Sequence, residues 1–164
     1  MQGMTKRERQ VTDEAQIRQI LDNGKILHLG LAVDNEPYVV PMNYGYAFEG
    51  EKLVIYLHSA VRGKKLDMIQ ANPRVFFQID CDIQPFEGKL PCQYGVSYSS
   101  VMGKGIARIV DDVEQKKQAM TILMKTQTGK DFLFDDKLVS IVTVIRIDVE
   151  TFTAKHRPLP EKMR

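Results

Sequence analysis

Residues 37–65 read PYVVPMNYGYAFEGEKLVIYLHSAVRGKK, and no other segment of the chain says more about its structure. Two runs with β-strand character are joined by the turn residues 48–51, which predicts a pair of antiparallel strands. The second run ends in His58 and Ser59, and a turn with glycine and lysines then leads into a short helix predicted over 64–71. The segment therefore predicts a strand–turn–strand–turn–helix unit.

The turn before this helix has the composition of an anion site. A hydroxyl, a glycine and two lysines lie where free backbone N–H groups and the positive end of the helix dipole point outward. Two cations at the positive end of a helix are unfavourable by themselves, so their presence favours a bound phosphate over a solvated turn. For His58, a hydrogen-bonded position in the core is the alternative interpretation. The residues concerned are His58, Ser59, Gly63, Lys64 and Lys65.

The strand before the turn offers a surface for a flat ring attached to that phosphate. Backbone edges from Tyr38 to Asn43, together with the Asn43 side chain, are expected to face the ring. The sequence shows no Ser, His and acid arrangement for nucleophilic catalysis and no carboxylate pair placed for acid–base chemistry. This favours a cofactor that carries the reactive chemistry itself. A phosphorylated planar cofactor is therefore expected, with flavin mononucleotide (FMN) as the leading candidate.

The whole chain predicts a mainly β protein. Helices are expected over 13–23, 64–71 and 112–129, the last burying Val113, Met120, Leu123 and Met124. Strands are expected over 26–33, 38–47, 52–57, 74–80, 96–110 and 138–149, and the first of these reads as buried on both faces. Residues 81–93 read as a loop and 153–164 as a basic tail. Six or so strands with helices at the edges predict a closed or nearly closed β-barrel with peripheral helices.

Length, charge and cysteine usage bound the class of protein. The 164 residues fit one domain, with 1–11 and 157–164 expected to be flexible or peripheral. A net charge of +2 is too small for a nucleic-acid-binding protein. No signal peptide or membrane-spanning run is recognised, so a soluble cytoplasmic protein is expected. Cys81 and Cys92 are expected to be free thiols, with a disulfide as the alternative, and no metal site is expected.

A second unusual cluster reads YGVSYSSVMGKG over residues 94–105. Its aromatics, hydroxyls and glycines fit a surface that lies against a flat ring or against another subunit. From composition alone, an edge strand rich in small residues is the simpler interpretation. The glycines at 103 and 105 indicate a bulge, a bend or a close backbone approach.

Three segments carry a family resemblance. In order they are HLGLAVDNEPYVVPMNYGY (28–46), LHSAVRGKKLDMIQANPRVFFQID (57–80) and YGVSYSSVMGKGIARIV (94–110). Their order and spacing resemble those of the pyridoxamine 5′-phosphate oxidase-like split-barrel flavoproteins, in particular the branch with nitroimidazole-resistance (Nim-type) proteins. The resemblance covers residues 11–156. It implies an FMN-binding split barrel, which is a six-stranded antiparallel Greek-key-like barrel.

The resemblance also implies a homodimer with two FMN molecules in grooves between the subunits. The residues it assigns to the cofactor are Val40, Pro41, Met42 and Asn43 at the ring, His58, Ser59 and Ala60 beside the ribityl chain, Gly63, Lys64 and Lys65 at the phosphate, and Tyr98, Ser99 and Ser100 of the partner subunit. Several positions depart from the family pattern. Ser59 and Val61 stand where an acid is frequent, Tyr94 where tryptophan is frequent and Ser99 where arginine is common. Residues 153–164 do not match the substrate-binding segment of true pyridoxamine-phosphate oxidases, so vitamin B6 oxidation is not expected.

Two classes of function follow. The first is an FMN-dependent reductase that passes electrons from NAD(P)H to a small planar acceptor, such as a nitro compound or a quinone. The second is a non-catalytic flavin or haem carrier, or a stress protein that retains the fold. In the haem variant, His28, His58 or His156 would ligate the iron.

Overall fold

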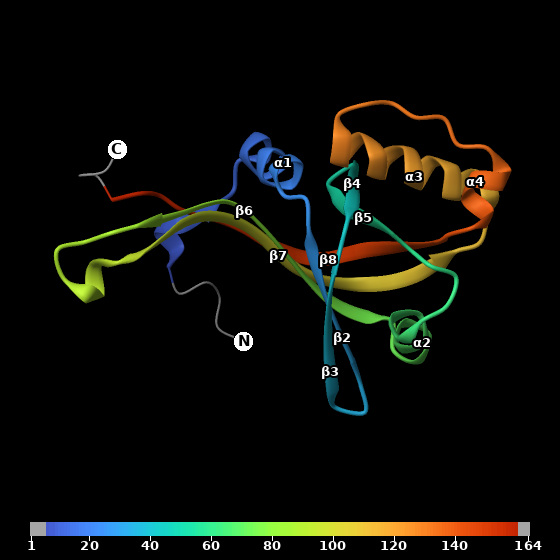
Figure 1. Cartoon of the computed structure of the whole chain (residues 1–164), viewed down its shortest axis with the longest axis horizontal. Coiled ribbons are helices and arrows are strands. Elements are labelled where there is room, and N and C mark those ends of the chain that lie inside the picture. The colour runs from blue at the N-terminus through green and yellow to red at the C-terminus, as the bar shows by residue number, and fades with distance from the viewer. Residues whose placement is uncertain (1–5, 161–164) are drawn as a thin grey trace.

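The computed structural model describes residues 6–160, and its strands form one antiparallel eight-stranded sheet (Figure 1). Across the sheet the order is β3-β2-β6-β7-β8-β5-β4, with β1 paired to β8 off this path. The strands are β1 (Gln10–Val11), β2 (Leu27–Val33), β3 (Glu36–Met42), β4 (Tyr44–Glu49), β5 (Lys52–Ser59), β6 (Arg74–Phe86), β7 (Gly95–Val110) and β8 (Thr143–Arg157). The helices are α1 (Glu14–Asn23), α2 (Lys64–Ala71), α3 (Val113–Thr128) and α4 (Asp136–Ser140), with 3₁₀ turns η1 (Arg7–Arg9) and η2 (Pro91–Gln93).

This architecture confirms the predicted fold class, a mainly β split barrel with peripheral helices. Two more strands are present than the sequence predicts. One is β1, which is too short to show a pattern. The other arises because the strand predicted over 38–47 divides at Asn43 into β3 and β4, which lie at opposite ends of the strand order. The chain therefore passes from one edge of the sheet to the other at Asn43.

The β6–β7 hairpin is longer than the sequence predicts and projects from the rest of the molecule (Figure 1). The loop expected over 81–93 is wrong in its first part, because β6 continues to Phe86. A bulge between Cys81 and Gln84 allows this, with Asp82 in the left-handed conformation at φ 54°. Both cysteines are free, Cys81 buried and Cys92 exposed.

The C-terminal part also differs from expectation. Residues 138–140, predicted to begin the last strand, belong instead to α4, and β8 starts at Thr143. The strand continues through the first residues of the predicted basic tail, to Arg157, because it pairs with β7 along nearly its whole length. Residues 1–5 and 161–164, which belong to the ends predicted to be flexible or peripheral, lie outside the described residues.

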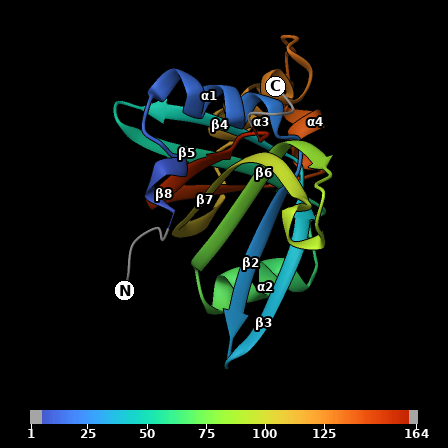
Figure 2. The same ribbon diagram turned by 90° about the vertical axis from the view of Figure 1, so that its left-hand side faces the viewer.

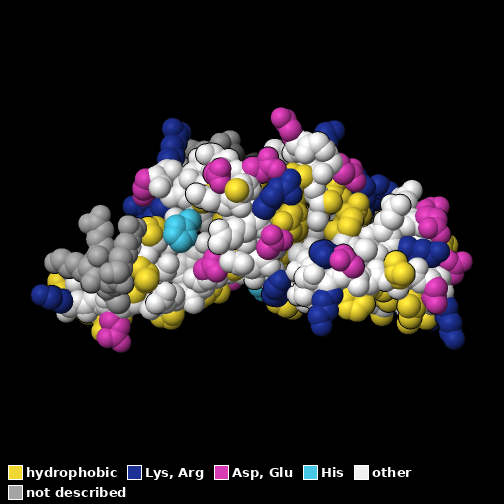
Figure 3. All heavy atoms as spheres, turned by 90° about the horizontal axis from the view of Figure 1, so that it is seen from above, with side chains coloured by type: hydrophobic (Ala, Val, Ile, Leu, Met, Phe, Trp, Pro, Cys, Tyr) yellow, Lys and Arg dark blue, Asp and Glu magenta, His cyan; other side chains and the backbone are white. Residues whose placement is uncertain are grey.

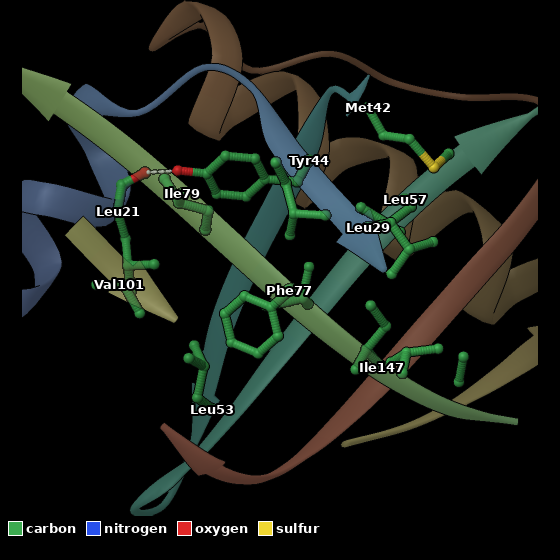
Figure 4. Packing of buried hydrophobic residues seen from close by; sticks show 14 of the residues in the cluster. Leu21, Leu29, Met42, Tyr44, Leu53, Leu57, Phe77, Ile79, Val101 and Ile147 are labelled. Carbon is green, nitrogen blue, oxygen red and sulfur yellow. Dashed lines mark hydrogen bonds between the residues drawn. The ribbon is translucent and has the colours of Figure 1, made fainter. Parts of the chain in front are cut away.

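The main core is formed by buried side chains of the strands and of helices α1 and α2, and Tyr44, Phe77, Leu29 and Leu57 are among its fully buried side chains (Figure 4). Burial of each such side chain stabilises the fold by about 1.5–3 kcal/mol. On β2 the burial alternates, so the prediction that this strand is buried on both faces is wrong for the described chain: Leu27, Leu29 and Leu31 are buried, whereas His28 is exposed.

Helix α3 packs on β4 at a point where only glycine fits. A Cβ atom on Gly45 would lie 2.3 Å from Cα of Leu123, so the missing side chain lets the helix backbone approach the strand. As predicted, Asp112 caps this helix, accepting from the N–H of Gln115, and Gly129 ends it in the left-handed conformation. Met120 and Leu123 are buried as expected. Val113 is 42% exposed, so its predicted burial is wrong.

Helix α2 lies against the β2–β3 hairpin (Figure 2). It buries Leu66, Met68 and Ile69, and the Asn72 amide after it donates to the carbonyl oxygen of Ala32 at 2.9 Å. The predicted bounds of this helix are confirmed, since it spans Lys64–Ala71. Among the described residues, none of the helices combines the length and apolar character needed to cross a membrane.

Candidate functional site

The turn between β5 and α2 holds the residues that the sequence assigns to a phosphate. β5 ends at Ser59, α2 begins at Lys64, and Gly63 is the N-cap of the helix. Gly63 has φ 145°, a conformation that a side chain would strain, and no side chain caps the helix end. The first N–H groups of α2 are therefore available to an external acceptor.

The two lysines at this helix end connect the turn with neighbouring strands. The Lys64 ammonium lies 4.7 Å from the centre of the Tyr38 ring on β3, a cation–π contact. Lys65 is half-buried and lies near His58 on β5, where it contributes to lowering the pKa of that imidazole. The structure thus brings together the predicted phosphate turn and the strand predicted to face the ring.

His58 has an unmet hydrogen-bonding requirement. Its Nδ1 atom is buried and has no hydrogen-bond partner among the described residues. Leaving such an atom unpaired costs roughly 1–3 kcal/mol, which makes it a marker for a group that binds there. Burial, and secondarily Lys65, lowers the pKa of His58, so the ring is neutral at pH 7 and offers one donor and one acceptor nitrogen. The alternative interpretation, a fully satisfied core histidine, does not hold for Nδ1.

The neighbouring residues of the turn differ in what they can offer. The Ser59 hydroxyl is buried and donates to the carbonyl oxygen of Ala60 at 2.8 Å, so its proton is used within the chain. Its lone pairs are the part that can accept from a ligand. Ala60 and Gly63 are exposed, and a Cβ atom on Gly63 would meet nothing within 4 Å, so the approach to the helix end is open.

The four predicted ring-facing residues do not present their side chains alike. Pro41 and Asn43 are exposed and Val40 is half-buried, whereas the Met42 side chain points into the core (Figure 4). The Asn43 amide donates at 3.3 Å to the carbonyl oxygen of Lys25 and at 3.3 Å to the side chain of Gln127. Met42 can therefore meet a ligand only through its backbone, and Asn43 chiefly through its carbonyl oxygen.

Tyr98, Ser99 and Ser100 lie far from this turn within one chain. On β8, Tyr98 pairs with Arg157, whereas His58 pairs with Val144 near the other end of that strand. At about 3.3 Å per residue, the separation measured along the strand is roughly 40 Å. Residues from both groups can meet at one ligand only if the second group comes from another copy of the chain.

The second group makes its own contacts within the chain. Ser99 and Ser100 are each 4% exposed, and Ser99 Oγ lies 3.0 Å from Nδ1 of His156. The Lys155 ammonium lies 5.7 Å from the centre of the Tyr98 ring. His156 and Lys155, assigned by the sequence to the basic tail, therefore support this segment from β8.

Sequence reasoning did not single out the Tyr38 side chain, which holds Lys64 at the mouth of the turn. The feature of the sequence that could have identified it is an aromatic residue at the start of the predicted strand that leads to Asn43. Within residues 6–160, no group of three or more His, Cys, Asp or Glu side chains is arranged to hold a metal ion.

Comparison with solved structures gives relatives with this fold. A "putative 5-nitroimidazole antibiotic resistance protein" from Bacteroides thetaiotaomicron is 29% identical, with a TM-score of 0.75, over 90% of this chain and 86% of that one. The flavocytochrome Anf3 from Azotobacter vinelandii is 16% identical, with a TM-score of 0.76, over 96% and 73%. The FAD and heme binding protein from Mycobacterium smegmatis is 14% identical, with a TM-score of 0.74, over 93% and 76%.

No curated protein sequence matches the chain significantly. A family model described as pyridoxamine 5′-phosphate oxidase matches residues 13–156, which include the β5–α2 turn, β3 and the Tyr98–Ser100 segment. This span agrees with the resemblance predicted from the three sequence segments. The chain belongs to the pyridoxamine 5′-phosphate oxidase family.

Proposed function

We propose that this protein binds FMN in a groove shared by two copies of the chain, and that it reduces small planar acceptors with electrons from NAD(P)H. The observation that carries the proposal is the unpaired Nδ1 of His58, buried beside an uncapped helix end with two lysines. An anionic ligand with a hydrogen-bonding chain next to it satisfies all three features at once.

The phosphate is assigned to Gly63, Lys64 and Lys65. The N–H groups at the start of α2 donate to its oxygens, and the two ammonium groups neutralise its charge. His58, Ser59 and Ala60 lie beside the ribityl chain, and His58 Nδ1 forms with it the hydrogen bond that it lacks in the described chain. Val40, Pro41, Met42 and Asn43 then face the ring, and Tyr98, Ser99 and Ser100 of the partner subunit close the groove.

A homodimer is supported by an apolar area on the outer face of the sheet. Val39 is 63%, Phe76 51% and Met102 39% exposed, although all three belong to regular strands. Gly30 of β2 pairs with both Val39 and Phe76, so the first two side chains flank a position without a side chain. Contact with a second copy removes this apolar surface from water. It also explains how two residue groups that lie far apart within one chain can act at the same ligand.

When bound, the flavin supplies hydride and electron transfer, chemistry that no side chain of this protein provides. The chain's own residues hold the phosphate, orient the ring and limit the entry of water. The nitro-compound class of acceptor is supported by the relative whose name refers to 5-nitroimidazole resistance, which is 29% identical to this chain.

The direct test is an absorbance spectrum of the purified protein, followed by addition of NAD(P)H and a panel of nitro compounds and quinones. We expect an oxidised-flavin spectrum that NAD(P)H bleaches and an acceptor restores. A colourless protein that does not take up added FMN would contradict the proposal.

The second candidate is a flavin or haem carrier without turnover. It is favoured by the same unpaired His58 nitrogen, which could ligate iron, and by two relatives of this fold whose names include a flavocytochrome and a haem-binding protein. Binding of FMN without acceptor reduction, or a Soret band after addition of haem that His58→Ala removes, would support the carrier instead.

A further inference from the structure

The last turn of α3 lies beside the point where the chain crosses the sheet at Asn43. Figure 3 looks onto the face of the molecule that carries α1 and α3, where charged side chains of both signs surround hydrophobic ones. Gly45 lets the helix backbone approach β4 at Leu123, and Gln127 follows one helical turn later on the same side of α3. The helix meets the proposed flavin site through the contact of Gln127 with Asn43.

The hydrogen bonds of the Gln127 side chain permit one orientation of its amide. Its Nε2 donates to the carbonyl oxygen of Tyr44 at 2.7 Å and to that of Lys25 at 3.3 Å. A backbone carbonyl oxygen can only accept, so the amide nitrogen must face these two groups and Oε1 must face away from them. This Oε1 accepts from Asn43 Nδ2 at 3.3 Å. Gln127 therefore determines which end of the Asn43 amide faces it.

The same reasoning fixes the amide of Asn43. Its two partners, Gln127 Oε1 and the carbonyl oxygen of Lys25 at 3.3 Å, are both acceptors, so Nδ2 faces them. Because Nδ2 carries two protons and has two acceptors, it has no proton left for a ligand. Asn43 is exposed, and its Oδ1 accepts no hydrogen bond within residues 6–160. The side chain thus presents an acceptor to whatever binds beside it.

Lys25 connects this arrangement to two helices. Its ammonium donates to the carbonyl oxygen of Thr126 at 2.9 Å, in the last turn of α3, and to that of Asp22 at 2.7 Å, in the last turn of α1. Its own carbonyl oxygen is the acceptor that Asn43 and Gln127 share. The two acceptors that hold the Asn43 amide are therefore fixed relative to each other.

The register of β4 and β5 places Asn43 next to His58. Tyr44 pairs with Leu57, and both side chains are buried in the core. Continuing that register by one position sets Asn43 across from His58, on the opposite face of the two strands, because side chains alternate along a strand. The acceptor of Asn43 and the unpaired Nδ1 of His58 thus belong to neighbouring positions, as two groups that contact one ligand must.

We infer that Gln127 is a positioning residue for the flavin ring, and that it acts by holding Oδ1 of Asn43 toward the ring as an acceptor. The oxidised isoalloxazine ring has a single N–H group, at N3. An Asn43 amide in the observed orientation accepts from this group, whereas a rotated amide would set a donor against it. This role rests on the proposed function, since it concerns the ring of the same bound flavin.

The test compares two flavins that carry the same phosphate, FMN and 3-methyl-FMN, in which a methyl group replaces the N3 proton. Both are titrated into flavin-free full-length protein, and flavin fluorescence reports binding. We expect the wild type to bind FMN at least tenfold more tightly than 3-methyl-FMN. Gln127→Leu should weaken FMN binding and bring this ratio below threefold, because the Asn43 amide is then free to rotate. Gln118→Leu, at an exposed position of the same helix, is the matched control and should leave the ratio unchanged.

A double variant separates positioning from a general structural effect. Because Gln127 acts through Asn43, the two substitutions should not be additive. In an Asn43→Leu background, where the ratio is already low, Gln127→Leu should change the ratio less than twofold. If Gln127 only stabilised the fold, its loss would weaken both flavins equally and leave their ratio at the wild-type value.

Three outcomes overturn the inference while the flavin proposal stands: equal binding of the two flavins by the wild type, a Gln127→Leu variant that keeps the wild-type ratio, and additive effects in the double variant. The first needs no variant, so it still decides if circular dichroism shows that Gln127→Leu does not fold. Absence of binding of either flavin overturns the proposed function, and this inference with it.

Discussion

The hydroxyl of Tyr44 donates to the carbonyl oxygen of Leu21 across 2.6 Å, deep in the core and at the junction of β4 and α1 (Figure 4). The carbonyl oxygen of Gly24 lies 3.0 Å from the same hydroxyl. Both carbonyls belong to the C-terminal end of α1, where the helix itself offers no partner. A single phenol on a strand thus satisfies the end of a helix and fixes that helix on the sheet.

We therefore expect Tyr44→Phe to destabilise the protein by about 1–3 kcal/mol, because two buried carbonyl oxygens lose their donor while packing is nearly unchanged. Urea unfolding of the variant measures this loss. Tyr94→Phe is the matched control, since Tyr94 is 54% exposed and its hydroxyl donates no hydrogen bond within the described residues. Equal stability of wild type and Tyr44→Phe would show that water replaces the hydroxyl.

The phosphate assignment predicts a selective loss of affinity. In Lys64→Ala with Lys65→Ala, FMN binding should weaken by tenfold or more, since each hydrogen bond to a charged group contributes roughly 1.5–3 kcal/mol. Riboflavin, which lacks the phosphate, should bind the variant and the wild type equally. Fluorescence titration of both flavins measures the ratio. Lys52→Ala, at the exposed start of β5, is the control, and an unchanged FMN affinity in the double variant would place the phosphate elsewhere.

A charged network on the outer face of the sheet predicts a dependence of stability on pH. Arg146 Nη1 and Nη2 each lie 2.7 Å from a carboxylate oxygen of Glu49, and Arg146 Nε lies 2.7 Å from Asp148. The hydrogen bond from Arg146 lowers the pKa of Glu49 below its usual 4.5. The pair therefore stabilises the fold fully above pH 4.5, and this contribution is lost as the pH falls through the lower pKa of the folded state.

Arg146→Met should consequently destabilise the protein by about 1 kcal/mol at pH 7, a value at the upper end for partly exposed pairs. Thermal unfolding of wild type and variant at several pH values between neutral and acid checks this. The two stability curves should converge as the pH falls from 4.5 through the lower pKa that Glu49 has in the folded protein. A difference that stays constant with pH would mean that Arg146 acts through packing of its aliphatic part, not through charge.

The helices could be predicted from the sequence because their signals are local. Asp13 and Asp112 accept from the N–H groups three residues later, and Asn72 with the following proline ends α2. The division of the strand at Asn43 could not be predicted in this way. Residues on both sides have strand character, and the break arises because Asn43 donates to Lys25 and Gln127, which are distant in sequence.

The candidate site shows the same difference between features that are local in sequence and features that depend on packing. Gly63 and the two lysines could be recognised as an anion turn because they are adjacent in sequence. The contact of Lys64 with Tyr38 and the missing partner of His58 Nδ1 depend on how β3, β5 and α2 pack, so only the structure shows them. The wide separation of Tyr98 from His58 likewise follows from the pairing of β8 with two different strands.

This separation leads to a prediction that links assembly with cofactor binding. Phe76 is 51% exposed on the outer face of β6, between Gly30 of β2 and Lys104 of β7. A carboxylate at this position would face Lys104 on β7, and burying these two charges in the proposed dimer contact would cost a desolvation free energy that their attraction does not offset. We expect Phe76→Glu to sediment as a monomer and to lose most of its FMN affinity, because Tyr98, Ser99 and Ser100 of the partner subunit are then missing.

Leu133→Glu is the control, since Leu133 is 98% exposed in the segment between α3 and α4, away from the sheet. A monomeric Phe76→Glu variant that binds FMN as tightly as the wild type would show that one chain forms the whole site.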